Sequence, residues 1–187
     1  LFEVKKSLFD KISIRSGSEK MIAIAKSKEL RLDELKLTKK DKVLVIESPE
    51  KPGNIGAILR TAAAAEINAV IISNIKTDIY HPNIIRSSLG GIFLLQIAID
   101  SSNRTINFLK KNKIFIISTS LNEEARNYNE IIYKTPFALI FGSEDKGLNP
   151  IWFKSSDQVA KIPTNETIDS LNLSVSAGIL IYHSINH

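Results

Sequence analysis

The first of three polar loops that follow short apolar runs spans residues 49–62, with the sequence PEKPGNIGAILRTA. Asn54 is a good helix N-cap, and the backbone amides after a cap point outward at the positive end of the helix dipole, so a phosphate could bind there. Gly56 and Arg60 are four residues apart and share a helix face, which leaves room beside the guanidinium for a substrate. The alternative is a capped core helix with one exposed arginine.

The second loop, residues 142–150 with the sequence GSEDKGLNP, has the glycine spacing of a phosphate-binding P-loop. Leu148 and Asn149, however, occupy the positions of the lysine and the serine or threonine that hold phosphate and Mg²⁺ in a P-loop. Nucleotide hydrolysis is therefore disfavoured. A glycine-rich loop at a strand end could instead let a flat ligand approach the backbone, and a plain turn is the alternative.

The third loop, residues 162–180, runs from a polar stretch into an apolar helix. Ser170, Asn172, Ser174 and Ser176 alternate there with apolar residues. A buried hydroxyl or amide without a partner costs about 1–3 kcal/mol, and helix capping accounts for only one of these side chains. The others therefore need partners elsewhere in the fold or in a ligand.

Short β-branched runs and helical stretches alternate along residues 43–187 and must position these loops. Buried strands are predicted over residues 43–46, 69–72, 114–117 and 137–141, and weaker ones over 93–97 and 158–162. Helices are predicted over residues 54–66, 82–88, 102–111 and from 171 to the C-terminus. The alternation predicts an α/β domain, with a mostly parallel sheet and helices on both faces. Ligands bind beyond the carboxyl ends of such strands, where the three loops would meet.

The basic excess is confined to the first quarter of the 187 residues. The chain has 25 Lys and Arg against 20 Asp and Glu, a net charge of +5. Residues 1–42 hold 12 basic and 7 acidic side chains, whereas residues 43–187 hold 13 of each. We interpret residues 1–42 as an appended element with β-prone pieces such as 21–25, followed by a polar linker that includes Lys39, Lys40 and Lys42. The excess permits a nucleic-acid partner.

Composition argues against several classes of site. The chain has no cysteine, which excludes disulfides, thiolate nucleophiles and cysteine-bound metals and favours a reducing compartment. His81, His183 and His187 show no metal-ligand spacing except an i, i+4 pair at the extreme C-terminus, so no metal site is expected. No apolar run reaches the ~18–20 residues of a membrane span, and no signal peptide is recognisable. A cytoplasmic protein without membrane contact is predicted. Trp152 is interpreted as a core aromatic rather than an interface anchor.

Taken in order, the three loops resemble the motifs of the SpoU (TrmH-type) RNA ribose methyltransferases of the SPOUT superfamily. The motifs are N-x-G-x-x-x-R at residues 54–60, G-S-E-x-K-G-L at 142–148, and I-P at 162–163 with S-L-N-x-S-V-x-A-G at 170–178. The stretch RSSLG at 86–90 is also similar to the family's R-x-S-x-G. The resemblance covers residues 43–187 as the catalytic domain. Residues 2–26 resemble more weakly the end of an L30e-like RNA-binding domain, so that residues 1–42 would be its remnant plus a linker.

The resemblance implies a fold and an activity that the residue patterns alone do not reveal. It implies a SPOUT fold with a C-terminal trefoil knot, a rare exception to the rule that chains do not thread. It implies methylation of a ribose 2′-hydroxyl in structured rRNA or tRNA with S-adenosyl-L-methionine, by a homodimer. The implied cofactor-binding residues are Thr119, Ser120, Leu121, Gly142, Ser143, Gly147, Ile162, Leu171 and Asn172. The implied catalytic residues are Asn54, Arg60, Glu144, Ser170 and Asn172.

A guanidinium loses its proton only above pH ~12, so Arg60 is a poor general base. We therefore expect Arg60 to grip the RNA phosphate and orient the 2′-hydroxyl, with Ser170 or Asn172 fixing the geometry. The sequence departs from the family pattern at four positions, which are Lys51, Glu66, Thr164 and Glu166. The last two lie on the loop expected to border the cofactor.

Two other classes of protein compete with this one. A SPOUT-like dimer that binds RNA without catalysis is disfavoured because the residues implied to be catalytic are all retained. Another kind of doubly wound nucleotide-binding enzyme would need G-x-G-x-x-G, or Lys-Ser after the glycine loop, and the sequence has neither.

Overall fold

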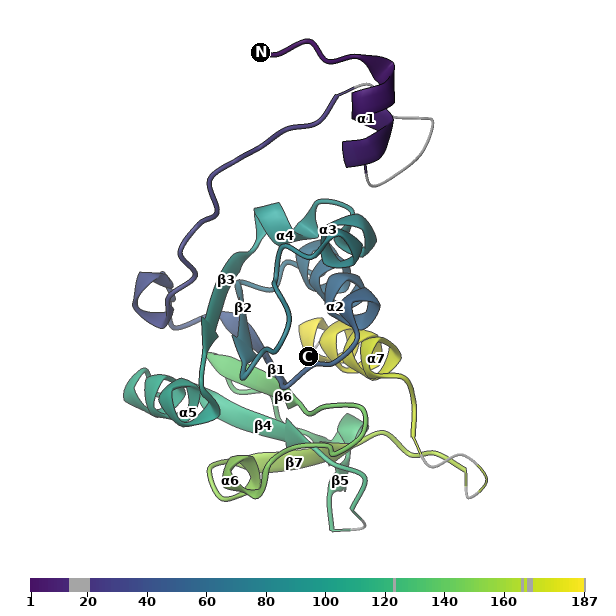
Figure 1. Cartoon of the computed structure of the whole chain (residues 1–187). Helices are drawn as coiled ribbons and strands as arrows, with labels where there is room; N and C mark the ends of the chain where they lie inside the picture. Colours follow the sequence, from purple (N-terminus) through teal and green to yellow (C-terminus); the bar gives the residue numbers. More distant parts are fainter. Residues whose placement is uncertain (14–20, 123, 166, 168–169, 187) are drawn as a thin grey trace.

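The computed structural model describes residues 1–13, 21–122, 124–165, 167 and 170–186. Within these residues, seven parallel strands form one sheet in the order β3-β2-β1-β6-β4-β7-β5 (Figure 1). The strands are β1 Lys42–Glu47, β2 Ala69–Ser73, β3 Gln96–Asp100, β4 Phe115–Thr119, β5 Arg126–Asn127, β6 Phe137–Phe141 and β7 Gln158–Lys161. The predicted α/β fold with a parallel sheet is confirmed.

Helices cover both faces of the sheet, as predicted (Figure 1). The helices are α1 Lys6–Ile12, α2 Pro52–Ala64, α3 Pro82–Ser88, α4 Gly91–Leu94, α5 Ser102–Lys111, α6 Pro150–Phe153 and α7 Leu173–Ile185, with short 3-10 turns at Leu32–Glu34 and Tyr128–Glu130. Helices α2, α3, α4 and α7 pack on one face, and α5 and α6 on the other. None of the helices in the described ranges is long and apolar enough to cross a membrane.

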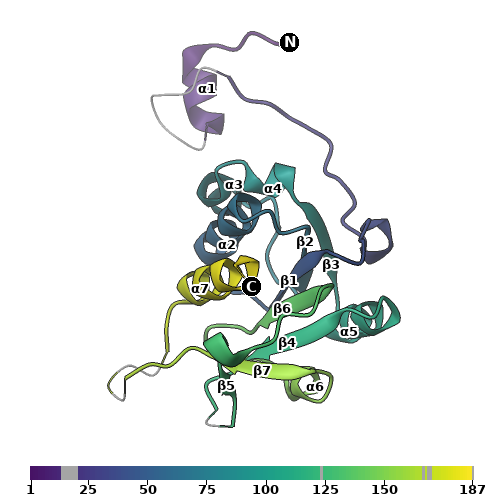
Figure 2. The same cartoon turned by 180° about the vertical axis from the view of Figure 1, so that it is seen from behind.

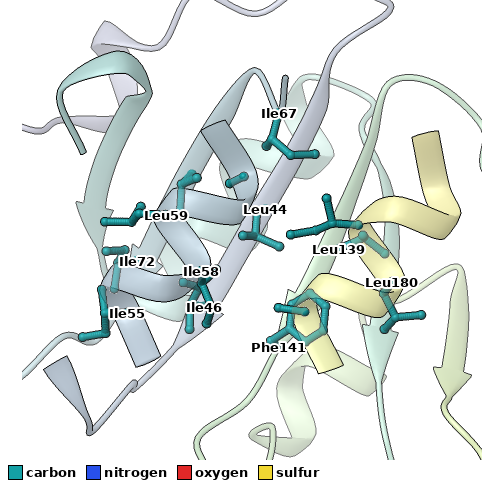
Figure 3. Close-up of a cluster of buried hydrophobic side chains, with 14 of the residues drawn as sticks. Leu44, Ile46, Ile55, Ile58, Leu59, Ile67, Ile72, Leu139, Phe141 and Leu180 are labelled. Carbon is teal, nitrogen blue, oxygen red and sulfur yellow. The ribbon is translucent and has the colours of Figure 1, made fainter. Parts of the chain in front are cut away.

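Alternation along β1 explains why two layers of helices are needed. Leu44 and Ile46 face α2 and α7, whereas Val43 and Val45 face the other layer, and all four are buried. Figure 3 shows the first of these clusters, with side chains from β1, α2, β6 and α7 meeting between the sheet and the helices. Successive residues of a strand point to opposite faces, so a continuous apolar run is a strand buried on both sides.

The predicted strand at residues 93–97 is displaced in the structure. Residues 91–94 form the short helix α4, and the strand begins at Gln96. Leu89 and Gly90 adopt positive φ angles of 47° and 88°, which turn the chain before α4. Phe93 and Leu94 are then exposed and lie outside the sheet. Residues 21–25 also form no strand, and their apolar side chains are largely exposed.

The segment from Leu30 to Asp41 is attached to the edge of the sheet. The Ile99 amide donates to the Leu30 carbonyl at 2.8 Å, and the Lys36 amide donates to Gln96 Oε1 at 2.9 Å. Leu32 is buried. These contacts cover the outer edge of β3, which would otherwise offer unpaired backbone groups to other chains. By contrast, α1 has no buried residue and lies apart from the sheet (Figures 1 and 2). The domain boundary at residue 42 stays a prediction.

After β7, near one edge of the sheet, the chain leads back to α7, which packs beside α2 and against β6 (Figure 2). The chain reaches it from β7 through residues 162–172, of which 166, 168 and 169 lie outside the described residues. The trefoil knot therefore stays a prediction.

Candidate functional site

Three side chains from the three polar loops meet at the carboxyl edge of the sheet. Asn54 Nδ2 donates to Glu144 Oε1 at 2.6 Å, and Asn172 Nδ2 donates to Asn54 Oδ1 at 3.3 Å. We call Asn54, Glu144 and Asn172 the central triad. Its members come from the start of α2, the loop after β6 and the start of α7, so the structure brings the three predicted loops together.

Asn54 does not cap its helix as the sequence suggested. Helix α2 begins at Pro52, and Lys51 is the N-cap, without a capping side chain. Proline favours the first helical position because its φ angle is preset and its missing N–H needs no partner there. Asn54 consequently lies inside the first turn, where its amide is free to bridge Glu144 and Asn172.

The carboxylate of Glu144 lies beside the first turn of α2, where the sequence suggested a phosphate. Oε1 accepts from Asn54, whereas Oε2 is buried and has no hydrogen-bond partner in the described part of the chain. The positive end of the helix dipole favours this negative charge. Glu144 thus acts as the chain's own anion at this point, which disfavours a phosphate bound at the same place.

The loop that carries Glu144 is closed by its own backbone. Ser143 and Gly147 exchange two backbone hydrogen bonds of 3.1 Å, and Ser143 Oγ accepts from the Lys146 amide at 3.1 Å. A Cβ on Gly142 would collide with the backbone of Gly147 and Leu148, so closure of this loop requires glycine at position 142. Cofactor binding by Gly142, Ser143 and Gly147 stays a prediction. Gly147 has a φ of 64° and open space at its α-carbon. This conformation favours glycine.

Asn172 also caps the last helix, as one member of the polar cluster was expected to do. Its Oδ1 accepts from the Ser174 amide at 2.9 Å and from Ser174 Oγ at 2.7 Å. A single side chain therefore holds the start of α7 and contacts Asn54. Ser170 is exposed and forms no hydrogen bond with other described residues.

Arg60 lies apart from the central triad. It follows Asn54 by six residues on α2, which is about 9 Å along the axis and about 120° around it. Its side chain is exposed and pairs with no acid in the described ranges. The predicted space for a substrate at Gly56 is wrong, because a Cβ there would lie 2.6 Å from the Ile84 carbonyl oxygen. Gly56 instead allows α2 and α3 to approach closely.

Most residues expected to bind a cofactor lie at or after the ends of the neighbouring strands β4, β6 and β7, whereas Leu171 and Asn172 precede α7. Thr119 Oγ1 donates to the Ile140 carbonyl at 2.9 Å, which ties the end of β4 to β6. The Ser120 amide donates to the Ala160 carbonyl at 2.9 Å, which ties β4 to β7. Leu121 is 61% exposed, and Ile162 and Leu171 are half-buried. Leu121 follows β4 and Ile162 follows the adjacent β7, so both apolar side chains lie at the carboxyl edge of the sheet. Thr164 is exposed, and Glu166 lies outside the described residues.

Glu47 is a positioning residue that the sequence analysis missed. It ends β1, is 4% exposed, and accepts from Ser102 Oγ at 2.5 Å and from the Asn149 amide at 2.8 Å. It therefore anchors the end of the Glu144 loop to β1 and α5. The only signal in the sequence is that an acidic residue directly follows the apolar run VLVI. An acid at the end of a buried strand needs hydrogen-bond donors, and the structure supplies two of them.

Other titratable and aromatic residues have structural roles. Trp152 is fully buried, which confirms its interpretation as a core aromatic. His81 Nδ1 accepts from the Asn83 amide at 3.1 Å and caps α3, and His183 packs against the rings of Tyr128 and Tyr133. In the part of the chain that the structure describes, no three His, Asp or Glu side chains are grouped to hold a metal ion.

Comparisons with known proteins, by sequence and by structure, both find RNA methyltransferases. The model of the SpoU rRNA Methylase family matches residues 41–182. The chain is 32% identical over 152 residues to the 23S rRNA (guanosine(2553)-2′-O)-methyltransferase RlmP of Bacillus subtilis, covering 81% of this chain and 61% of that protein.

Two solved structures illustrate the similarity of fold. An AdoMet-bound rRNA methyltransferase from Sinorhizobium meliloti superposes with a TM-score of 0.81 at 27% identity, over 86% of this chain and 61% of that one. An RNA 2′-O ribose methyltransferase superposes with a TM-score of 0.78 at 29% identity, over 98% of this chain and 70% of that one. The chain spans about three fifths of the length of the curated relatives it matches.

Proposed function

Because this chain belongs to the SpoU rRNA methylase family, we propose that it transfers a methyl group from S-adenosylmethionine to a ribose 2′-hydroxyl of structured ribosomal or transfer RNA. The observation that carries the proposal is the central triad. Asn54, Glu144 and Asn172 come from the three family motifs, are separated by up to 118 residues in sequence, and are joined by hydrogen bonds. In a chain that had lost the activity, no function would maintain the hydrogen bonds between these motifs.

The residues at the carboxyl edge fit S-adenosylmethionine. Leu121, Ile162 and Leu171 are apolar and at least partly exposed, as side chains that bury a flat adenine ring must be. When bound, the cofactor supplies an electrophilic methyl group on a positively charged sulfur. The chain's own residues must then align the attacking hydroxyl with that methyl and accept one proton, and alignment is the larger share of the work.

Within this mechanism we assign the central triad a positioning role. Glu144 holds Asn54, and Asn54 holds Asn172 at the start of α7, so the three loops keep one relative arrangement. Arg60 is exposed and without an acid partner among the described residues, which suits a guanidinium that binds an RNA phosphate from outside the fold. It would orient the ribose while Ser170 or Asn172 fixes the 2′-hydroxyl.

A homodimer is part of the proposal. Arg60 lies apart from the central triad within one chain, so a complete site requires either RNA that bridges the two places or a second copy that supplies its own Arg60. The resemblance to the family favours the second copy near the active site. Residues 1–42 as the remnant of an RNA-binding domain, and a cytoplasmic location, are likewise predictions.

The test is methyl transfer from tritiated S-adenosylmethionine to separated ribosomal and transfer RNAs, followed by mapping of the modified ribose. We expect Arg60→Ala to lose transfer by at least about 100-fold, because the ribose is no longer oriented, while calorimetry finds cofactor affinity unchanged. Arg104→Ala, an exposed arginine of α5 on the other face of the sheet, serves as the matched control and keeps activity. Cofactor binding without methylation of any RNA would contradict the proposal, as would a large loss of cofactor affinity in Arg60→Ala.

A further inference from the structure

A cluster of lysines gathers at the amino edge of the sheet, opposite the candidate site. Six of them are exposed, and none forms an ion pair with a described residue. They are Lys39, Lys40, Lys110, Lys111, Lys113 and Lys134. We call these six residues the amino-edge lysine surface.

The topology brings these lysines together although they lie up to 95 residues apart in sequence. They lie in the segments that lead into β1, β4 and β6, three adjacent strands of the sheet. The Phe137 amide donates to the Asp41 carbonyl at 3.3 Å, and the Phe115 amide donates to the Pro136 carbonyl at 2.8 Å. These bonds join the three entering segments side by side. Lys134 Nζ also lies 5.5 Å from the centre of the Phe115 ring.

Few acidic groups oppose this positive charge. The Asp41 carboxylate is buried and accepts from the Thr38 amide at 2.7 Å and from Thr38 Oγ1 at 2.6 Å. Asp157 Oδ2 accepts from the Ile116 amide at 2.7 Å. Glu66 is exposed at the end of α2, one strand further along. Four of the six lysines belong to residues 43–187, which carry as many acids as bases, so their grouping with Lys39 and Lys40 beside only two exposed acids is a local concentration of charge.

The backbone at Lys113 adds a second observation. This residue has a φ of 55° and follows Asn112, the C-cap of α5, at a position where glycine is the usual choice. A lysine there accepts a conformation that costs about 1 kcal/mol or more for a residue with a Cβ. The charge at this position is therefore not explained by local backbone preference. The helix dipole accounts for the lysines at the C-terminal end of α5, which are Lys110, Lys111 and Lys113, but not for Lys39 or Lys134.

We infer that the amino-edge lysine surface is a second RNA-binding surface, which contacts phosphates of a segment remote from the methylated nucleotide. The inference rests on the proposed function, which supplies RNA as the partner. The six residues of β1 separate the two edges by about 20 Å, so the RNA must be folded and large enough to reach both. Lysines that contact only phosphates would bind the RNA backbone irrespective of the RNA sequence.

The experiment compares the wild-type chain with a variant carrying Lys110→Gln, Lys111→Gln, Lys113→Gly and Lys134→Gln. The probe is ribosomal RNA transcribed in vitro, and its dissociation constant is measured across salt concentrations. The salt slope is the slope of the logarithm of the binding constant against the logarithm of the salt concentration. Each phosphate that a lysine no longer neutralises lowers its magnitude by about 0.9. We therefore expect the magnitude of the slope to fall by about 2 to 3.5, and RNA binding at low salt to weaken at least about tenfold. The KM for RNA rises, whereas kcat and cofactor affinity stay at wild-type values, because the surface is remote from the chemistry.

The matched control replaces the same four lysines by arginine, which keeps the charge and should keep the affinity. Lys113→Gly alone relieves the left-handed backbone while it removes one charge, so weaker RNA binding by this variant cannot result from lost stability. An unchanged dissociation constant and salt slope in the four-lysine variant would overturn the inference and leave the proposed function intact. Failure of the wild-type chain to methylate any RNA would instead contradict the proposed function.

Discussion

Replacing Asn54 by alanine tests whether the central triad holds the three loops together. The change removes the donor to Glu144 at 2.6 Å and the acceptor for Asn172 at 3.3 Å. It also leaves both oxygens of the Glu144 carboxylate without a partner, since Oε2 already has none among the described residues. The substitution should therefore destabilise the fold and not only the site.

The magnitude follows from the hydrogen bonds that Asn54 makes. A hydrogen bond to a charged group contributes about 1.5–3 kcal/mol, and the longer amide pair contributes about 0.5 kcal/mol. Alanine returns about 0.5 kcal/mol through its higher helix propensity. The free energy of unfolding should thus fall by about 2 kcal/mol, which lowers Tm by about 4–8 °C for a chain of this size.

The assay is thermal and urea unfolding followed by circular dichroism. Asn83→Ala is the matched control, because Asn83 also lies in the first turn of a helix after a proline and its side chain is exposed. In the Asn54→Ala background, Glu144→Gln should recover about 1 kcal/mol, because it removes the stranded charge. A Tm shift below about 1 °C in Asn54→Ala, or no recovery in the double variant, would refute this account of the site.

Two further substitutions test the packing around the site and the core. Gly56→Ala should lower the free energy of unfolding by about 1–3 kcal/mol, because the new Cβ would collide with the backbone of α3. Gly53→Ala in the same helix is the control, because a Cβ there meets nothing within 4 Å and should not destabilise the fold. Equal urea midpoints for the two variants would contradict the packing argument. Tyr133→Phe should raise the free energy of unfolding by about 1 kcal/mol near neutral pH, because the buried hydroxyl has no partner in the described part of the chain. Burial raises the pKa of Tyr133 to about 12 from the ordinary 10, so the folded state keeps the proton longer and wild-type stability falls between about pH 10 and 12. The phenylalanine variant should lack that fall in a Tm series against pH, and identical curves would refute the assignment.

The architecture was predictable because its signals are local. Short continuous apolar runs such as VLVI and FALIF are typical of strands buried on both faces, and their alternation with helical stretches favours a parallel sheet between two layers of helices. The rule that ligands bind beyond the carboxyl ends of such strands then located the three loops. The failures were also local. Phe93 and Leu94 fit a strand by composition, but the turn at Leu89 and Gly90 carries them out of the sheet.

Only the tertiary structure decided what the polar side chains contact. The local sequence predicts that Asn54 caps a helix, yet its hydrogen-bond partners lie 90 and 118 residues further along the chain. Gly56 reads as room for a substrate, yet α3 fills that room. The sequence around Lys39 and Lys40 indicates a solvated linker, whereas the strand order places this linker beside the segment that carries Lys134. The physical reason is that periodicity and propensity report one segment's own backbone, whereas a hydrogen bond or a charge cluster depends on segments that meet only when the sheet forms.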